Sequence, residues 1–330
     1  MDSCAYVTQG WGVHDERWVA ALRDCGFTVE TFSRDRDGLS PEEIRVALDR
    51  DRGPVLAGPV NSMTAALVGG SRPVIGLSWG FDLLEMHVSG SDLSWMSRLN
   101  GLIVDSHANR DIALGSGIAT NRVFEIPWGI DIGAFAPQGD TLTPDTFDLP
   151  STARLILSLR ALEPLYCVAD IIDAFALIAA DHPDAYLLIG NNGHLRDELE
   201  ARAASSGVGR RIRFIGKLAE SELPRLLRAA SIYVTASEMD GTSVTLLQAM
   251  ACEIPVVASD TPGNRQWVAP DRAGALFTTR STEALADRLR EMLDSPPEPT
   301  QRAAARAVVV ENADWTKNSA ALGSIMRGSA

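Results

Sequence analysis

Lysine is nearly absent from this 330-residue chain: only Lys217 and Lys317 occur, so almost every cationic side chain is an arginine. Acidic residues outnumber basic ones by 43 to 30, which gives a net charge of −13. A nucleic-acid-binding protein usually presents a basic face. The charge balance therefore argues against that class and leaves room for a local phosphate site made by a few basic side chains.

Cysteines and long apolar runs are also scarce. The four cysteines are far apart, and no pair has the spacing of a metal site or a redox motif, so we expect reduced, mostly buried thiols at Cys4, Cys25, Cys167 and Cys252. No apolar run approaches the roughly 20 residues that span a bilayer. The N-terminus carries Asp2 and no basic region before an apolar run, unlike a secretory signal. These absences predict a cytoplasmic protein without a transmembrane segment, and they leave contact with a membrane surface open.

Short apolar runs alternate with amphipathic stretches along the chain, which is typical of parallel sheets with right-handed helical crossovers. The length suits two domains of about 150 residues each. The pattern stops over residues 138–153, where Gly139, Pro144 and Pro150 break regular structure, and then restarts. We predict an α/β protein with two doubly wound domains, 1–137 and 154–313, a linker over 138–153, and a helix over 314–330 that could return to the first domain.

The expected strands are Cys4–Thr8, Thr28–Phe32, Val55–Ala57, Val74–Ser78, Gly101–Asp105 and Val123–Ile126 in the first domain, and Leu155–Ser158, Ala185–Ile189, Ile212–Ile215, Ile232–Ala236 and Pro255–Ala258 in the second. In open sheets of this kind, ligands bind beyond the carboxyl ends of the strands. The loops that follow these strands are therefore the places to look for a site.

The loop after Ile232–Ala236 carries the most polar chemistry. Asp240, Gly241, Thr242 and Ser243 form a polar turn before an expected helix over Val244–Cys252. The start of a helix offers unpaired backbone N–H groups and the positive end of its dipole, so a diphosphate fits there. Gly241 lets the backbone approach closely, Asp240 could receive sugar hydroxyls, and Gln248 lies just over one turn inside the helix. The same segment is also compatible with an ordinary helix that has an aspartate or threonine as its N-cap.

This segment resembles family 4 of the GT-B glycosyltransferases. That family carries two acids separated by seven residues, then an EAMACG-P-VV-S-D run. Here Asp240 takes the first acid position, Gln248 takes the second, and AMACEIPVVASDTPGNR follows in step. Other segments are similar to the family in the expected order: VDSHANRD at 104–111, VFEIPWGIDIGAFAP at 123–137, SLRALEPLY at 158–166 and IRFIGKL at 212–218. The resemblance implies a GT-B fold, in which two Rossmann-like domains face a cleft.

The resemblance also implies roles for the second domain. Asp240 would contact the donor sugar, Gln248 the ribose hydroxyls, and Arg160 the donor diphosphate, together with Gly241, Thr242, Ser243 and Val244 at the helix start. Gln248 departs from the family because it brings no charge, which weakens its hydrogen bonds. The family usually has a lysine where Leu165 stands. Lys217 is a candidate source of the missing charge, or else an ordinary surface lysine.

The first domain would supply the acceptor side. Gly10, Trp11 and Gly12 follow the first strand and suit a tight loop near phosphate or acceptor, but Asp15 replaces the third glycine of a dinucleotide-binding fingerprint. Trp79 could stack on a sugar face or pack. Many relatives have a histidine there, so a histidine role cannot be transferred. Asp82 could bind an acceptor hydroxyl or cap a helix, and His14 and His107 lie near candidate loops.

The resemblance implies transfer with retention of anomeric configuration. The nucleoside diphosphate would leave while the acceptor attacks from the same face, and the leaving phosphate could take the proton, so no enzymatic base is named. We expect no cofactor and no metal, because the acid pairs Asp35–Asp37 and Asp49–Asp51 lie in charged segments that are expected to be exposed to solvent. A UDP-sugar is the first expected donor and a GDP-sugar the second.

The expected acceptor is a small molecule, such as a thiol or a natural-product scaffold, and a homodimer is compatible with the sequence. Three other functions fit the same fold: a nucleotide-sugar epimerase, a glycogen-type phosphorylase, and a non-catalytic partner that binds nucleotide weakly. The run around Asp240 argues against the first two, and the phosphorylases are also much larger. The departures at Trp79, Leu165 and Gln248 keep the third open.

Overall fold

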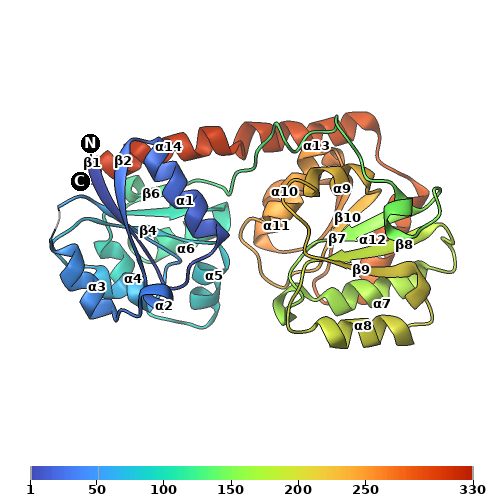
Figure 1. The fold of residues 1–330 in the computed structure, drawn as a ribbon, viewed down its shortest axis with the longest axis horizontal. Helices are drawn as coiled ribbons and strands as arrows, with labels where there is room; N and C mark the ends of the chain where they lie inside the picture. Colours follow the sequence, from blue (N-terminus) through green and yellow to red (C-terminus); the bar gives the residue numbers. More distant parts are fainter. Residues whose placement is uncertain (1, 51, 329–330) are drawn as a thin grey trace. The chain divides into compact units, whose positions relative to one another are not determined.

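The computed structural model describes residues 2–50 and 52–328, and the chain divides into two compact units. Unit 1 holds the described residues up to Gly129 together with those from Trp315 onward, and unit 2 is Ile130–Asp314. Each unit is a parallel six-stranded sheet with helices on it (Figure 1). This is the predicted α/β class with two doubly wound domains.

The sheet of unit 1 has the strand order β2-β1-β3-β4-β5-β6. Helices α3 to α6 contribute apolar side chains to the core on one face, whereas α1 and α14 pack against each other. The strands are β1 (Asp2–Thr8), β2 (Phe27–Ser33), β3 (Val55–Ala57), β4 (Val74–Leu77), β5 (Gly101–Val104) and β6 (Val123–Glu125). The helices are α1 (Val13–Asp24), α2 (Arg34–Asp37), α3 (Pro41–Leu48), α4 (Ser62–Leu67), α5 (Phe81–Val88), α6 (His107–Gly115) and α14 (Trp315–Gly328), with short 3-10 turns η1 (Ser94–Arg98) and η2 (Thr120–Arg122).

The sheet of unit 2 has the order β12-β11-β10-β7-β8-β9. Helices α7, α8 and α12 bury one face, and α9, α10, α11 and α13 bury the other (Figure 1). The strands are β7 (Arg154–Ser158), β8 (Ala185–Gly190), β9 (Ile212–Gly216), β10 (Ile232–Thr235), β11 (Val256–Ser259) and β12 (Gly274–Phe277). The helices are α7 (Val168–Ile178), α8 (Arg196–Ser205), α9 (Leu223–Ala229), α10 (Val244–Ala251), α11 (Pro262–Trp267), α12 (Thr282–Asp294) and α13 (Pro299–Asn312), with 3-10 turns η3 (Pro144–Phe147), η4 (Pro164–Tyr166), η5 (Gly209–Arg211) and η6 (Pro270–Arg272).

The C-terminal helix α14 belongs to unit 1. The ring of Trp315 packs edge-on against Trp18 of α1, with 5.2 Å between ring centroids, and the guanidinium of Arg17 lies 3.8 Å over the Trp315 ring. At the other end of α14, Arg327 pairs with Asp2 of β1 at 2.9 Å. The helix is therefore held at both ends by the first unit.

Residues 138–153 differ from the predicted linker, because the structure packs them within unit 2. Leu149 is buried in the core there. The backbone N–H of Leu142 donates to Arg225 O at 3.1 Å, and Arg228 Nε donates to Asp140 O at 2.8 Å. The chain passes from unit 1 to unit 2 at Gly129–Ile130. Turn residues mark irregular backbone, but irregular backbone can still pack when it carries apolar side chains.

None of the helices among the described residues combines the length and the apolar character needed to cross a bilayer.

Candidate functional site

The loops after β7 and β10 form a buried polar cluster at the carboxyl edge of the unit 2 sheet. These strands are hydrogen-bonded neighbours, so the residues that follow them meet. Arg160 Nη2 lies 2.9 Å from Asp240 Oδ2, and Arg160 Nη1 donates to Ser243 Oγ at 2.8 Å. The guanidinium lies 4.2 Å over the ring of Tyr166. We call Arg160, Tyr166, Asp240 and Ser243 the Arg160 cluster.

Burial dominates the electrostatics of this cluster. The side chains of Arg160 and Asp240 are both 13% exposed. Burial raises the pKa of the Asp240 carboxyl, and the Arg160 guanidinium opposes that rise. Burial alone would lower the pKa of Arg160, but the negative charge of Asp240 contributes to a net upward shift. Arg160 therefore stays cationic, and its buried Nε has no hydrogen-bond acceptor among the residues that the structure describes.

Helix α10 begins within the same cluster. Ser243 is its N-cap, since its Oγ accepts from the backbone N–H of Leu246 at 3.4 Å, so neither Asp240 nor Thr242 takes the cap role that the sequence suggested. One hydroxyl thus serves both the helix start and Arg160. Val244 is the first helical residue, and Gly241 and Thr242 form the turn before it.

A glycine of α11 supports this turn. A Cβ added at Gly263 would lie 1.9 Å from Gly241 O and 2.4 Å from Asp240 O, so no other residue fits without moving the backbone. The position of Asp240 thus depends on a contact with a distant part of the chain, which local sequence patterns do not reveal.

Gln248 lies in the second turn of α10 and is 8% exposed. Its Oε1 is buried and has no donor among the described residues. Buried polar atoms are nearly always paired, and an unpaired one costs about 1–3 kcal/mol. An unpaired acceptor on the helix that starts at the Arg160 cluster can accept a hydrogen bond from a hydroxyl group of a ligand.

Lys217 follows β9, which is two strands from β7 in the sheet. Its side chain is exposed and makes no ion pair or hydrogen bond with the described residues. The neighbouring loops are tied together, because the backbone N–H of Asn191 donates to Gly216 O at 2.6 Å and Asn191 Nδ2 donates to Leu159 O at 3.4 Å. Lys217 therefore lies at the same edge of the sheet as Arg160. Its ammonium group has no ion-pair partner among the residues that the structure describes.

Two further residues at this edge were not predicted from the sequence. Tyr166 stacks under Arg160. Arg280 follows β12 and bridges Asp170, at 3.1 Å, and Glu238, at 3.3 Å. Leu165, which stands at the family's lysine position, contributes a backbone carbonyl that accepts from Glu238 N at 2.9 Å.

In unit 1, the loop of Gly10, Trp11 and Gly12 follows β1 and closes on a carboxylate. Asp15 is fully buried, and it accepts from Gly12 N at 2.8 Å and from Tyr6 Oη at 2.9 Å. An acid therefore already uses one backbone N–H at the start of α1. This arrangement does not favour the phosphate that the loop was also expected to suit.

Trp79 follows β4 and packs in an aromatic group. Its ring centroid lies 5.6 Å from that of His14 and 6.3 Å from that of Trp128, both edge-on. Its indole N–H is buried without an acceptor among the described residues. The other predicted histidine, His107, is 72% exposed and pairs with Glu125 at 2.6 Å.

Asp82 is buried, and protein donors use both of its carboxylate oxygens. Oδ1 accepts from Ser78 Oγ at 2.7 Å, Trp79 N at 3.0 Å and Leu83 N at 2.9 Å, and Oδ2 accepts from Val60 N at 2.8 Å. Burial raises the pKa of Asp82 to about 6, against these hydrogen bonds. The structure thus favours a structural role for Asp82, in which it holds the surrounding backbone, over binding of an acceptor hydroxyl.

The two acid pairs Asp35–Asp37 and Asp49–Asp51 were expected to be solvated surface residues, and those that the structure describes are exposed or make ordinary contacts. Asp35 is exposed, Asp37 pairs with Arg36 at 2.8 Å, and Asp49 accepts from Ser71 Oγ. Asp51 lies outside the described residues.

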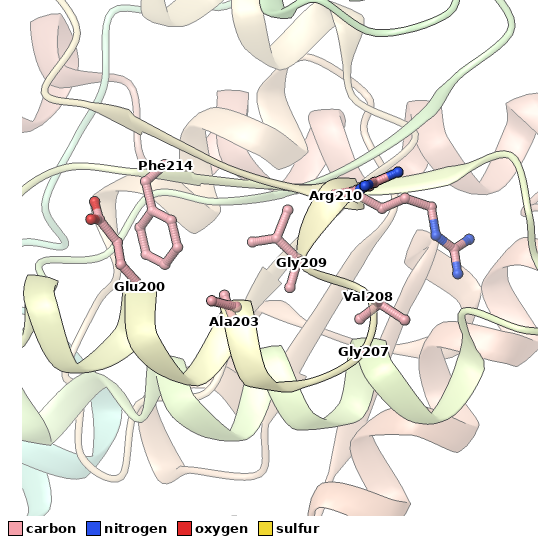
Figure 2. Close-up of a pocket in the computed structure, with 10 residues that line it drawn as sticks. Glu200, Ala203, Gly207, Val208, Gly209, Arg210 and Phe214 are labelled. Carbon is pink, nitrogen blue, oxygen red and sulfur yellow. The ribbon is translucent and has the colours of Figure 1, made fainter.

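Figure 2 shows a separate hollow of about 600 Å³ in unit 2, between α8 and the edge strand β9. Glu200 and Phe214 lie toward one end and Arg210 toward the other. Arg210 precedes β9, at the amino end of that strand, whereas the Arg160 cluster follows the carboxyl ends. None of the predicted site residues lines the hollow.

The model of a protein family described as "Glycosyl transferases group 1" matches residues 142–308. A GDP-mannose-dependent monoacylated alpha-(1-6)-phosphatidylinositol monomannoside mannosyltransferase from Corynebacterium glutamicum is 27% identical over 61% of this chain and 55% of its own length. A phosphatidyl-myo-inositol mannosyltransferase from Mycobacterium leprae is 29% identical over 67% of this chain and 57% of its own. The match thus spans little more than half the length of these relatives.

Solved structures share the fold over nearly the whole chain. The crystal structure of HepE from Anabaena in complex with UDP has a TM-score of 0.79 at 17% identity, covering 99% of this chain and 100% of that one. Sucrose-phosphate synthase from Thermosynechococcus elongatus has a TM-score of 0.82 at 16% identity, covering 99% of both chains. These likenesses confirm the predicted fold.

Proposed function

Because this chain belongs to the family of glycosyl transferases group 1 and has the GT-B fold, we propose that it transfers a sugar from a nucleoside-diphosphate sugar to a small acceptor. In this proposal unit 2 holds the donor and unit 1 holds the acceptor. The observation that supports it best is the Arg160 cluster at the start of α10. Arg160 Nε and, on that helix, Gln248 Oε1 have no hydrogen-bond partner among the described residues.

Each group of this site has a role in the proposed reaction. The bond between the anomeric carbon and the diphosphate oxygen breaks, and negative charge builds on the leaving phosphate. Arg160 and the N–H groups at the start of α10 stabilise that charge without reorganising. Asp240 receives hydroxyls of the donor sugar, and Gln248 binds the ribose. Lys217 is a further candidate for a phosphate contact.

We further propose retention of configuration, with the acceptor attacking from the face that the diphosphate leaves. The leaving phosphate takes the acceptor's proton, so no side chain serves as base and no metal or other cofactor is required. The donor is a UDP- or GDP-sugar: HepE was crystallised with UDP, and the corynebacterial relative is described as GDP-mannose-dependent. None of the four cysteines forms a disulfide, in keeping with the cytoplasmic location that we propose.

A second candidate function is a non-catalytic partner that keeps the fold. It is supported by Leu165 in place of a lysine, and by the neutral Gln248. In that case Arg160 and Asp240 would only stabilise the unit through their ion pair.

Isothermal titration with UDP, GDP and ADP separates the two functions. Binding of one nucleotide that Arg160→Ala weakens by about 10- to 100-fold and Arg265→Ala leaves unchanged supports the donor site. Arg265 is a matched control because it also pairs with an aspartate, Asp260, but is 60% exposed. Absence of binding to all three nucleotides would refute the proposal that unit 2 binds the nucleotide-sugar donor.

A donor screen then tests the reaction itself. Release of nucleoside diphosphate is measured with and without candidate acceptors, and the sugar product is analysed for transfer or isomerisation. Acceptor-dependent release that Asp240→Ala abolishes supports the transferase. Isomerised sugar without transfer would point to an epimerase instead.

A further inference from the structure

We infer that unit 1 accepts an uncharged acceptor with an aromatic group and discriminates against phosphorylated acceptors. This inference rests on the proposed transferase function, and it specifies the class of acceptor. The relevant surface consists of Trp11, Val13, His14, Trp79 and Phe81, which we call the aromatic face.

The aromatic face is at the edge of the sheet where a ligand is expected. Trp11 follows β1 and Trp79 follows β4, and ligands of open parallel sheets bind beyond these carboxyl ends. His14, in the first turn of α1, contacts the second of these loops, since its ring centroid lies 5.6 Å from that of Trp79. The start of α1, which Trp11 precedes by two residues, and the loop after β4 are thus neighbours.

Apolar side chains are exposed on this surface. Val13 and Phe81 are the first residues of α1 and α5, and they are 71% and 41% exposed. Val13 adjoins His14 and Phe81 follows Trp79 by two residues, so the contact between His14 and Trp79 brings the starts of α1 and α5 together. Large apolar side chains that are exposed in one place mark a binding surface more often than scattered ones do. Aromatic neighbours such as Trp79 favour an aromatic ligand, because rings pack edge-on or offset with a preference beyond area burial.

The charges beside the aromatic face are unfavourable for an anion. The fully buried Asp15 accepts from Gly12 N at the start of α1, where a phosphate would otherwise receive that hydrogen bond. A second carboxylate is close, since Asp35 Oδ2 lies 3.5 Å from the position of a Cβ on Gly10. Each of these charges repels a phosphate held in the same loop.

The arginine that contacts this loop does not compensate for those acids. The guanidinium of Arg36 lies 4.3 Å over the ring of Trp11, but it also donates to both oxygens of Asp37, at 2.8 and 3.2 Å. Its charge is therefore paired, and its main contribution to the surface is to hold the Trp11 ring.

The test compares 2-naphthol with 2-naphthyl phosphate, which share a ring and differ by the phosphate. Titration calorimetry of the full chain should show 2-naphthol binding at least about tenfold more tightly. Phe81→Ser and Val13→Ser should each weaken 2-naphthol binding by about threefold or more, because they remove exposed apolar area without disturbing a core. Val46→Ser on α3 is the matched control, since Val46 is 55% exposed and outside the aromatic face.

Asp15→Asn tests the charge separately. The amide oxygen can still accept from Tyr6 Oη, but the amide nitrogen replaces the oxygen that accepts from Gly12 N, so the variant loses that hydrogen bond together with the charge. Urea unfolding checks that the variant folds, and the variant should strengthen binding of 2-naphthyl phosphate relative to 2-naphthol by about tenfold. Equal or tighter binding of the phosphate ester to the wild-type chain would overturn the inference. So would 2-naphthol binding that neither Phe81→Ser nor Val13→Ser weakens.

Nucleotide titrations on the same samples keep the two proposals apart. A preference for 2-naphthol without any nucleotide binding would refute the proposed donor site and leave the acceptor inference standing. Acceptor-dependent transfer to a phosphorylated acceptor, by a protein that does not bind 2-naphthol, would refute the acceptor inference and leave the proposed transferase function standing.

Discussion

Arg160 and Asp240, the two residues assigned to the donor, are bound to each other: Nη2 of the arginine lies 2.9 Å from Oδ2 of the aspartate, and both side chains are largely buried. The charge proposed to bind a diphosphate is thus already balanced by a carboxylate. A donor must therefore compete with Asp240 for Arg160, or use the unpaired Nε. This relationship makes opposite predictions for nucleotide binding and for transfer.

Asp240→Asn should strengthen nucleotide binding and impair transfer. Without the carboxylate, Arg160 offers its full charge to the diphosphate, so the Kd for UDP or GDP should fall by about tenfold. The rate of transfer should fall by about 100-fold, because the negative charge beside the reacting sugar is lost. Calorimetry and product release measure the two effects. Weaker nucleotide binding would contradict the competition between the diphosphate and Asp240.

Arg160→Ala should weaken nucleotide binding by about 10- to 100-fold, the value of a charge-assisted hydrogen bond. It should also destabilise unit 2 by about 3–5 kcal/mol, because Asp240 is left buried and uncompensated. The double variant Arg160→Ala/Asp240→Asn should recover most of the stability but not the binding. Arg265→Ala breaks an exposed pair and should cost no more than about 1 kcal/mol. Urea midpoints and calorimetry give both quantities, and a double variant that binds nucleotide normally would remove Arg160 from the donor site.

Gln248→Glu should strengthen nucleotide binding by about fivefold, since a carboxylate makes stronger hydrogen bonds to ribose than an amide does. Gln248→Met, of similar shape, should weaken binding by a similar factor. A 2′,3′-dideoxy nucleoside diphosphate should bind the wild type and both variants alike, because it lacks the hydroxyls in question. If the variants also differ toward the dideoxy nucleotide, Gln248 does not act through the ribose.

Most of the fold could be predicted from the sequence, because buried parallel strands are short apolar runs with clear boundaries. The expected strand Val55–Ala57 coincides with β3, and the helix expected to start at Val244 does so as α10. β12 was missed since GALF is short and begins with a glycine, which weakens any strand pattern.

The site was less accessible to sequence reasoning. Asp240 and Arg160 could be assigned through a resemblance, but the bond from Arg160 to Ser243 and the support of the Asp240 turn by Gly263 join residues that are distant in the chain. Asp82 shows the opposite limit. Its position after a strand left two roles open, binding of an acceptor hydroxyl or capping of a helix, whereas the structure shows that four donors within the protein use its carboxylate. Local patterns identify loops, and only tertiary packing shows which polar groups remain unpaired.

The buried carboxyl of Asp82 predicts a pH dependence of stability. Its ordinary pKa is 3.8, and burial raises the folded-state pKa to about 6. Between about pH 4 and pH 6 the folded chain therefore keeps a proton that the unfolded chain has released. The free energy of unfolding should fall as the pH rises through this window, by about 3 kcal/mol from this residue.

Asp82→Asn provides the comparison for that prediction, because an amide does not titrate. The variant should lack this part of the pH dependence, while contributions from all other groups remain and cancel in the difference. Urea unfolding followed by tryptophan fluorescence suits the measurement, since six of the seven tryptophans belong to unit 1, where Asp82 is located. Identical pH profiles for the wild type and Asp82→Asn between pH 4 and 6 would show that the Asp82 carboxyl titrates normally in the folded state.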